Sequence, residues 1–123
     1  MSYAPHLLPK VRSERLMESI RGMPCTLRIS SFVPGHKCAS RETVVGCHLP
    51  TIGKGTRTKV TDLAVVAACF HCHNLLDRVD LRIDYIEMKF PAALAGRMLD
   101  ALVETHAMLV SAGIITVADS EII

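Results

Sequence analysis

The sequence contains no tryptophan and few other aromatic residues, two tyrosines and three phenylalanines in 123 residues. A chain of this length forms a single modest core, and so few large rings leave that core thin. The shortage also argues against single-strand nucleic-acid binding by base stacking, which relies on aromatic side chains. We therefore expect a stabilising element besides apolar packing.

Long apolar runs are also missing. The longest unbroken run is Leu63–Phe70, whereas a membrane-spanning helix needs roughly 20 apolar residues. The first twenty residues include Pro5, Pro9, Lys10 and Arg12 and have no apolar segment of the secretory type. We expect no membrane partner and a cytoplasmic location.

The net charge of +2 is unevenly distributed along the chain. Residues 1–60 contain ten Lys/Arg and three Asp/Glu, whereas residues 61–123 contain four Lys/Arg and nine Asp/Glu. Two solvated faces of opposite sign would explain this pattern. A basic front half that meets a polyanion, such as the phosphate backbone of DNA, would explain it equally well.

The local patterns predict one α+β domain over residues 1–123. It comprises an N-terminal arm (1–20), a core (21–80) and a C-terminal helical extension (81–123). Within these parts the spacing predicts a helix over 13–21, strands over 25–29 and 42–49, an apolar stretch over 62–69 and a helix over 73–79. Residues 81–90 are compatible with helix or strand.

A long helix is expected between Pro91, which suits a first helical turn, and Gly113, which suits a helix end. Two apolar stripes leave it only a narrow polar strip, so it is expected to be buried on more than one side. Either it is the central helix of a monomer, or it also packs on a second copy as a homodimer.

The five cysteines predict a metal site. Their odd number and the lack of an export signal argue against a disulfide framework. Cys69-x-x-Cys72 has the spacing of a zinc knuckle, and Cys25 and Cys38 are the natural candidates to complete a structural four-thiolate zinc site. The alternative for Cys25 and Cys38 is a pair of ordinary buried thiols. A c-type haem attachment at 69–73 would require export.

Two histidines extend the pattern. His73 and Asp77 are four residues apart, a helical spacing that allows them to share a metal ion or to form a simple surface pair. His48 ends the predicted strand over 42–49, where a lone histidine is more often structural than catalytic.

These elements together resemble the HNH, or ββα-metal, endonuclease superfamily. The residues that carry the likeness are Thr43-Val-Val-Gly-Cys-His48-Leu-Pro, the Gly-Lys-Gly loop at 53–55, Asp62-Leu and Cys69-x-x-Cys-His73-x-x-x-Asp77. A closer likeness is to a family of small phage and prophage proteins classed as candidate nucleases, related to a recombinase-dependent HNH nuclease. It is carried by Arg21-Gly-Met-Pro-Cys-Thr-Leu-Arg-Ile29, Glu104-Thr-His106 and Ala112-Gly-Ile114.

The resemblance implies a small zinc-stabilised ββα finger with a long C-terminal helix, and a metal-dependent DNA endonuclease active in phage or prophage recombination or DNA processing. His48 would be the general base, and His73 and Asp77 would bind the catalytic ion, which is Mg²⁺, Mn²⁺ or Zn²⁺. Cys47 holds a position that is often a ligand in the superfamily, and Asp62 is the nearest match to the middle Asn of the motif.

DNA phosphates are the expected targets of five basic residues: Arg28, Arg41, Lys54, Arg57 and Lys59. The same residues also fit an alternative function, a zinc-stabilised module that binds nucleic acid or a recombination protein without catalysis. The imperfect middle position and Cys47 favour this alternative.

Overall fold

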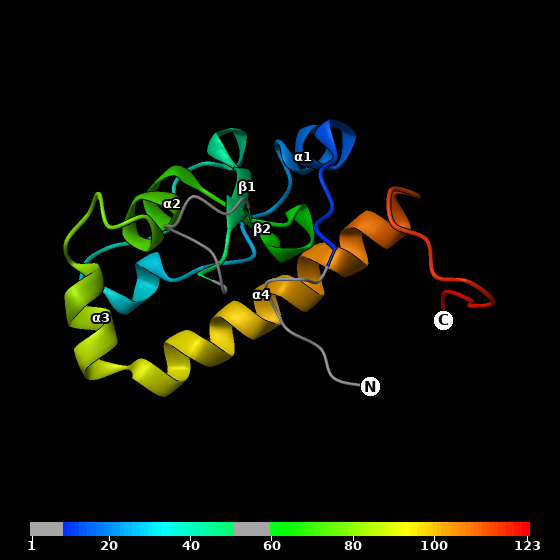
Figure 1. The fold of residues 1–123 in the computed structure, drawn as a ribbon. Helices are drawn as coiled ribbons and strands as arrows, with labels where there is room; N and C mark the ends of the chain where they lie inside the picture. Colours follow the sequence, from blue (N-terminus) through cyan, green and yellow to red (C-terminus); the bar gives the residue numbers. More distant parts are fainter. Residues whose placement is uncertain (1–8, 51–59) are drawn as a thin grey trace.

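The structure is a computed structural model that describes residues 9–50 and 60–123. Its elements are α1 (Glu14–Ile20), β1 (Val45–His48), β2 (Val65–Ala68), α2 (Phe70–Leu76), α3 (Ile83–Lys89) and α4 (Pro91–Ser111), with 3-10 turns at Ser30–Phe32, Arg41–Thr43 and Asp62–Ala64. The fold is therefore of the small α+β type, as expected. Figure 1 shows α4 running beneath the small sheet, with α1 near its C-terminal end and α3 near its N-terminal end.

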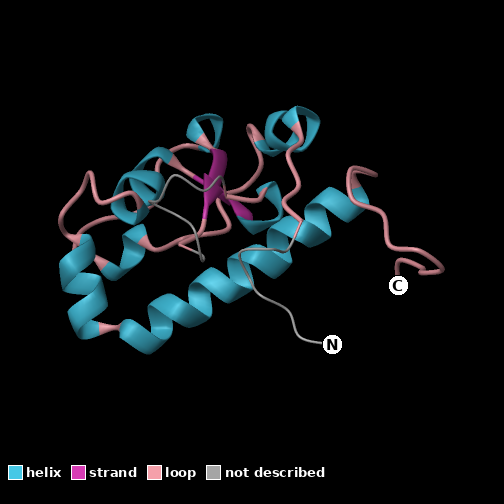
Figure 2. Ribbon diagram, viewed as in Figure 1, coloured by secondary structure: helices cyan, strands magenta, loops and turns pink. Residues whose placement is uncertain are grey.

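The sheet consists, in the described residues, of the antiparallel pair β1 and β2, which are short and central in Figure 2. Cys47 pairs with Val66 and His48 pairs with Val65. All four residues of β2 are buried, because β1 lies at its edge and α4 packs against it. The predicted strand over 42–49 is shortened, since residues 41–43 form a 3-10 turn instead.

Helix α1 confirms the helix expected over 13–21, ending one residue earlier. The Ser13 hydroxyl caps it by accepting a hydrogen bond from the Leu16 N–H at 3.1 Å. Leu16 and Ile20 are buried, and the helix packs closely on β1. At Gly46 in β1 a Cβ atom would lie 2.8 Å from both the Val65 Cγ2 and the end of the Met17 side chain, so any larger residue there would force these side chains to shift.

Helix α4 begins at Pro91 and is followed by Gly113 with a φ of +74°, as the sequence predicts. Its buried residues are Leu94, Ala101, Thr105 and Leu109. Leu99 and Val103 lie outside this stripe and are 63% and 62% exposed. A second packing surface on α4, and with it a homodimer, therefore stays a prediction.

The strand predicted over 25–29 is wrong. Arg28 has a φ of +47°, which a regular strand does not accommodate, and no strand is present in this stretch. The segment still lies against β2, because the Thr26 and Leu27 N–H groups both donate to the Ala67 carbonyl at 2.8 and 3.3 Å. Neighbouring Cys25 is thereby brought beside the end of β2.

A buried pair of threonines joins this segment to α4. The Thr26 hydroxyl donates to the Ala67 carbonyl at 3.0 Å, and the Thr105 hydroxyl lies 2.9 Å from the Thr26 hydroxyl. The Ala67 N–H in turn donates to the Thr105 Oγ1 at 3.2 Å. Three segments distant in sequence are thus joined through fully satisfied buried polar groups.

The helix predicted over 73–79 begins earlier and ends earlier. Helix α2 starts at Phe70, because Cys69 occupies the N-cap position with its sulfur 3.5 Å from the Cys72 N–H. Residues 83–89, ambiguous from the sequence, form α3. Among the helices of residues 9–50 and 60–123, none has both the length and the apolar composition needed to cross a membrane.

Candidate functional site

Four cysteine sulfurs meet where the N-terminal loops contact the start of α2. The Sγ atoms of Cys25, Cys38, Cys69 and Cys72 all lie within 4.8 Å of one another, and those of Cys38 and Cys72 are 3.8 Å apart. This separation is far longer than a disulfide bond. It equals the edge, about 3.8 Å, of a tetrahedron of sulfurs at the usual zinc–sulfur distance. The donor set therefore fits a tetrahedral ion such as zinc.

Backbone and hydroxyl groups surround these sulfurs. The Ala39 N–H donates to the Cys69 sulfur at 3.3 Å, and the Cys69 N–H donates to the Cys25 sulfur at the same distance. The Ser30 hydroxyl lies 3.1 Å from the Cys72 sulfur. Such contacts orient thiolate ligands and stabilise their negative charge, so they support a metal site better than a chance cluster of thiols.

The thiols cannot all ionise without a cation. Hydrogen bonds with Cys25 and Cys72 lower the pKa of Cys69, whereas hydrogen bonds with Cys25 and Cys69, together with burial, raise the pKa of Cys72. Burial, together with repulsion from the charge of Cys25 and Cys69, raises the pKa of Cys38 to about 12. A bound divalent ion would supply the positive charge that four adjacent thiolates require.

A second group of candidate ligands lies between β1 and the end of α2. One ligand atom each from Cys47, His73 and Asp77 lies within 4.8 Å of the others. Cys47 is buried in β1, His73 is in the second turn of α2, and Asp77 is the C-cap of that helix. The His73 Nε2 and the Asp77 Oδ2 are 2.8 Å apart. The i, i+4 spacing thus brings His73 and Asp77 together, as predicted, and β1 adds a thiol.

His48 is next to Cys47 in β1, but its imidazole is held by a different partner. Its Nε2 is 2.9 Å from the Asp62 Oδ1, and the other carboxylate oxygen of Asp62 accepts the Ser13 N–H at 2.7 Å. Burial opposes ionisation of Asp62, but the hydrogen bonds from Ser13 and His48 outweigh it and lower the pKa of this carboxyl. Asp62 thus links His48 to the start of α1.

The predicted phosphate contacts are only partly described. Lys54, Arg57 and Lys59, with the Gly-Lys-Gly loop at 53–55, lie outside the described residues. The Arg28 guanidinium donates to Glu104 on α4 at 2.8 Å, and this hydrogen bond lowers the pKa of Glu104. The Arg41 Nε donates to the Gly22 carbonyl at 2.6 Å. Contacts of Arg28 and Arg41 with phosphate stay predictions.

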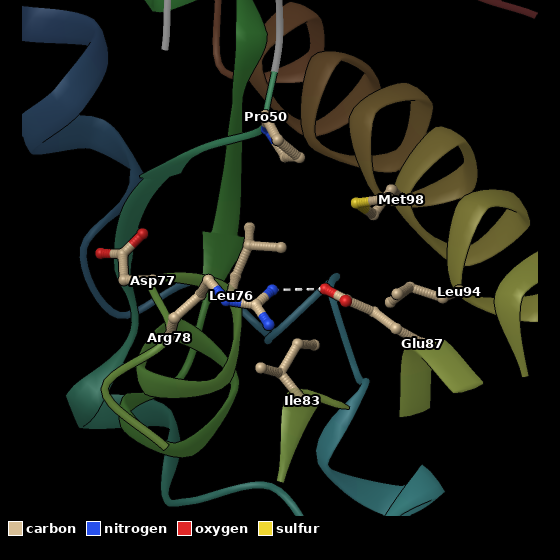
Figure 3. Close-up of a pocket in the computed structure, with 8 residues that line it drawn as sticks. All are labelled: Pro50, Leu76, Asp77, Arg78, Ile83, Glu87, Leu94 and Met98. Atoms are coloured by element: carbon tan, nitrogen blue, oxygen red, sulfur yellow. Dashed lines mark hydrogen bonds and ion pairs between the residues drawn. The ribbon is translucent and has the colours of Figure 1, made fainter. Parts of the chain in front are cut away.

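A pocket of about 360 Å³ opens beside Asp77. Its walls are mainly apolar, and its lining residues are Pro50, Leu76, Asp77, Arg78, Ile83, Glu87, Leu94 and Met98. In Figure 3 the Arg78 guanidinium extends across the pocket to Glu87, 2.6 Å away, and Asp77 lies at the edge opposite Leu94. Arg78 also pairs with Asp84. Of the candidate ligands, Asp77 alone borders this pocket.

The sequence reasoning missed the groups that support these sites. Ser13, Ser30 and the Ala39 N–H each hold a candidate residue that is far away in the sequence. A capping serine at the start of α1 was expected, but nothing local indicates that its N–H also binds Asp62. Backbone N–H donors leave no trace in the sequence.

Fold and site together define a small α+β protein with a four-cysteine metal-type cluster beside a second cysteine, histidine and aspartate group. The chain belongs to the family whose model is described as "Putative nuclease YbcO", which matches residues 14–108. It is 31% identical over 101 residues to "Putative nuclease YbcO" of Escherichia coli (strain K12), covering 81% of this chain and 95% of that protein. The same values hold for "Putative nuclease ybcO" of Enterobacteria phage 82. No solved structure matches the chain.

Proposed function

We propose that this protein is a metal-dependent DNA endonuclease of the HNH type that hydrolyses phosphodiester bonds. The observation that carries the proposal is the grouping of Cys47, His73 and Asp77, together with the Asp62 carboxylate that holds the ring of His48, the residue after Cys47 in β1. The order β1, β2, α2, with His48 at the end of β1 and His73 on α2, supports the HNH assignment. Membership in a family with a nuclease name supports it independently.

In this proposal the four-cysteine cluster binds a structural zinc ion. Cys69 and Cys72 begin α2, and His73 follows directly, so an ion held by the cluster fixes the start of the helix that carries His73. Cys25 and Cys38 connect the same ion to the N-terminal loops. This link supplies the stabilisation, besides apolar packing, that we expect in a small core with few aromatic residues.

His48 acts as the general base. In this role the His48 imidazole takes a proton from the attacking water, and the ionised Asp62 carboxylate, 2.9 Å from Nε2, stabilises the imidazolium that results. The low pKa of Asp62 keeps that carboxylate charged when His48 becomes protonated. Asp62 is thus a positioning residue rather than a catalytic one.

His73 and Asp77, which lie with Cys47 in the second ligand group, would hold the catalytic ion. When bound, this ion neutralises charge on the scissile phosphate and on the leaving oxygen. DNA is the proposed substrate, and the basic residues of the front half, Arg41 included, supply sequence-independent contacts to its backbone. A role in phage or prophage recombination or DNA processing is part of the proposal.

Cleavage of supercoiled plasmid tests the proposal. The wild-type protein should nick plasmid in the presence of a divalent cation and stop when the cation is chelated. His48→Ala should lower the rate by about 10²–10⁴-fold, the usual contribution of a general base. His36→Ala is the matched control, because the His36 ring lies against Arg82 and His71, outside the group of Cys47, His73 and Asp77, and it should leave the rate unchanged.

Two results contradict the proposal. Undiminished nicking by His48→Ala would exclude the general-base role. Absence of cleavage with every divalent cation, combined with DNA binding that withstands replacement of His48 and His73, would favour the non-catalytic zinc module. Cys47, which is a soft ligand beside a hydrolytic site, is the observation that keeps this second function in consideration.

A further inference from the structure

Cys47 lies in surroundings that differ from those of an ordinary buried thiol. It is 1% exposed in β1, opposite Val66. Its sulfur lies within 4.8 Å of ligand atoms of both His73 and Asp77, the imidazole and carboxylate at the end of α2. A thiol that merely fills space in a core is expected among aliphatic side chains. This sulfur instead completes a group of three donors from two separate elements.

The three donors are chemically mixed: one sulfur, one nitrogen and one oxygen. Mg²⁺ prefers six oxygen ligands in a nearly ideal octahedron and releases its water reluctantly, so a thiolate is a poor ligand for it. Zn²⁺ binds sulfur, nitrogen and oxygen at about 2.0–2.3 Å, and its catalytic sites typically have three protein ligands and one open position. Three donors at the edge of a fold match that pattern.

The spacing of the donors also suits a tetrahedral ion. Bond lengths of that size place neighbouring ligand atoms about 3.3–3.6 Å apart, and the observed limit of 4.8 Å requires shifts of only about 1 Å. The His73–Asp77 hydrogen bond of 2.8 Å already holds two donors together at the C-terminal end of α2. Cys47 is held by the antiparallel pairing of β1 with β2. Little conformational change is therefore needed.

We propose that Cys47 is a thiolate ligand of the second metal ion, so that this Cys–His–Asp site selects a thiophilic divalent cation such as Zn²⁺ over Mg²⁺. The proposal rests on the proposed function for the role of the ion, but not for its binding. It implies that the protein binds two thiophilic ions, one held by the four cysteines of the cluster and one held by Cys47, His73 and Asp77.

Cobalt spectroscopy on the full chain tests this assignment. The protein is first loaded with one equivalent of Zn²⁺ to fill the four-cysteine cluster, and Co²⁺ is then titrated while released Zn²⁺ is monitored with an indicator. The wild type should bind one Co²⁺ with a near-ultraviolet sulfur-to-cobalt charge-transfer band and no zinc release. Cys47→Asp should still bind Co²⁺ but lack the band, and Cys47→Ser should also lack it.

Three further variants and measurements make the result specific. Val66→Ala removes buried bulk opposite Cys47 without touching a ligand atom, and it should keep the band. His73→Ala should abolish both the band and the binding of the second ion. Competition titrations should show that Cys47→Asp shifts the Zn²⁺/Mg²⁺ affinity ratio toward Mg²⁺ by at least about tenfold, or about 1.4 kcal/mol.

The inference is overturned if wild type binds a second Co²⁺ without the band, if Cys47→Asp keeps the band, or if the affinity ratio is unchanged. Its failure is distinguishable from failure of the nuclease proposal. Plasmid cleavage in Mg²⁺ that is equal in wild type and Cys47→Ser would refute the thiolate ligand and leave the nuclease standing. A cobalt–sulfur band in a protein that cleaves no DNA would support the thiolate ligand and refute the nuclease proposal.

Discussion

Removal of the zinc ion proposed for the four-cysteine cluster is the perturbation with the largest expected effect. The cluster joins Cys25 and Cys72, so a bound ion closes a loop over residues 25–72. By the relation used for covalent cross-links, closing a loop of that length removes about 4 kcal/mol of chain entropy from the unfolded state. Direct zinc–thiolate bonding adds more, since structural zinc contributes about 10–16 kcal/mol to folding in small zinc-finger peptides at neutral pH.

These magnitudes compare with the total stability of a domain this size, roughly 6–18 kcal/mol at the usual value per residue. We therefore expect chelation by an excess of EDTA to unfold the protein at 25 °C and neutral pH, and re-addition of Zn²⁺ to restore it. Far-ultraviolet circular dichroism follows the loss of helix. Metal analysis of the dialysed protein should show one tightly bound zinc per chain.

A pair of cysteine substitutions separates metal binding from packing. Cys38 is half-buried in the cluster, whereas Cys47 is almost fully buried outside it. If only packing mattered, Cys47→Ser would be the more damaging change. With a structural ion, Cys38→Ser is expected to lower Tm further and to weaken zinc binding, while Cys47→Ser retains the tight zinc. An unchanged Tm in EDTA would refute the structural role of the ion. A larger fall in Tm for Cys47→Ser than for Cys38→Ser would also refute it.

Three other predictions concern the supports of the site. Because the folded Asp62 has a lowered pKa, its ionised form stabilises the fold above about pH 4, and this stability is lost as the pH falls through the folded value. Asp62→Asn should lower the free energy of unfolding by about 1–2 kcal/mol at pH 7 in urea titrations, and the variant should lose less stability than the wild type as the pH falls. An equal loss of stability in both proteins at low pH would contradict this. Thr105→Val leaves the buried Ala67 N–H unpaired and should cost about 1–3 kcal/mol, whereas Val103→Thr, the reverse change at an exposed position of the same helix, should stay within about 0.5 kcal/mol. Gly46→Ala places a methyl group 2.8 Å from the side chains of Met17 and Val65 and should lower stability by about 1–3 kcal/mol in the same assay; an unchanged Tm would show that these two side chains move aside freely.

Several features could be predicted because their causes are local. Ser13 caps α1, Pro91 begins α4 and Gly113 takes the left-handed conformation after it, each for reasons contained within a few residues. The Cys69-x-x-Cys72 spacing and the i, i+4 relation of His73 and Asp77 are equally local. The same reasoning failed at residues 25–29, where alternation indicates a strand but Arg28 adopts a positive φ and the N–H groups turn to one carbonyl of β2.

The sequence by itself therefore determined the start of α1, both ends of α4, the cysteine knuckle and the types of donor available for metal binding, because each depends on neighbours along the chain. Only the tertiary structure decided which donors share a site. Pairing of β1 with β2 and packing of α2 brought Cys47 to His73, and the turn before β2 brought Asp62 to both His48 and Ser13. These partners are separated by 14 or more residues, and contacts over such distances depend on how whole elements pack, which no local pattern encodes.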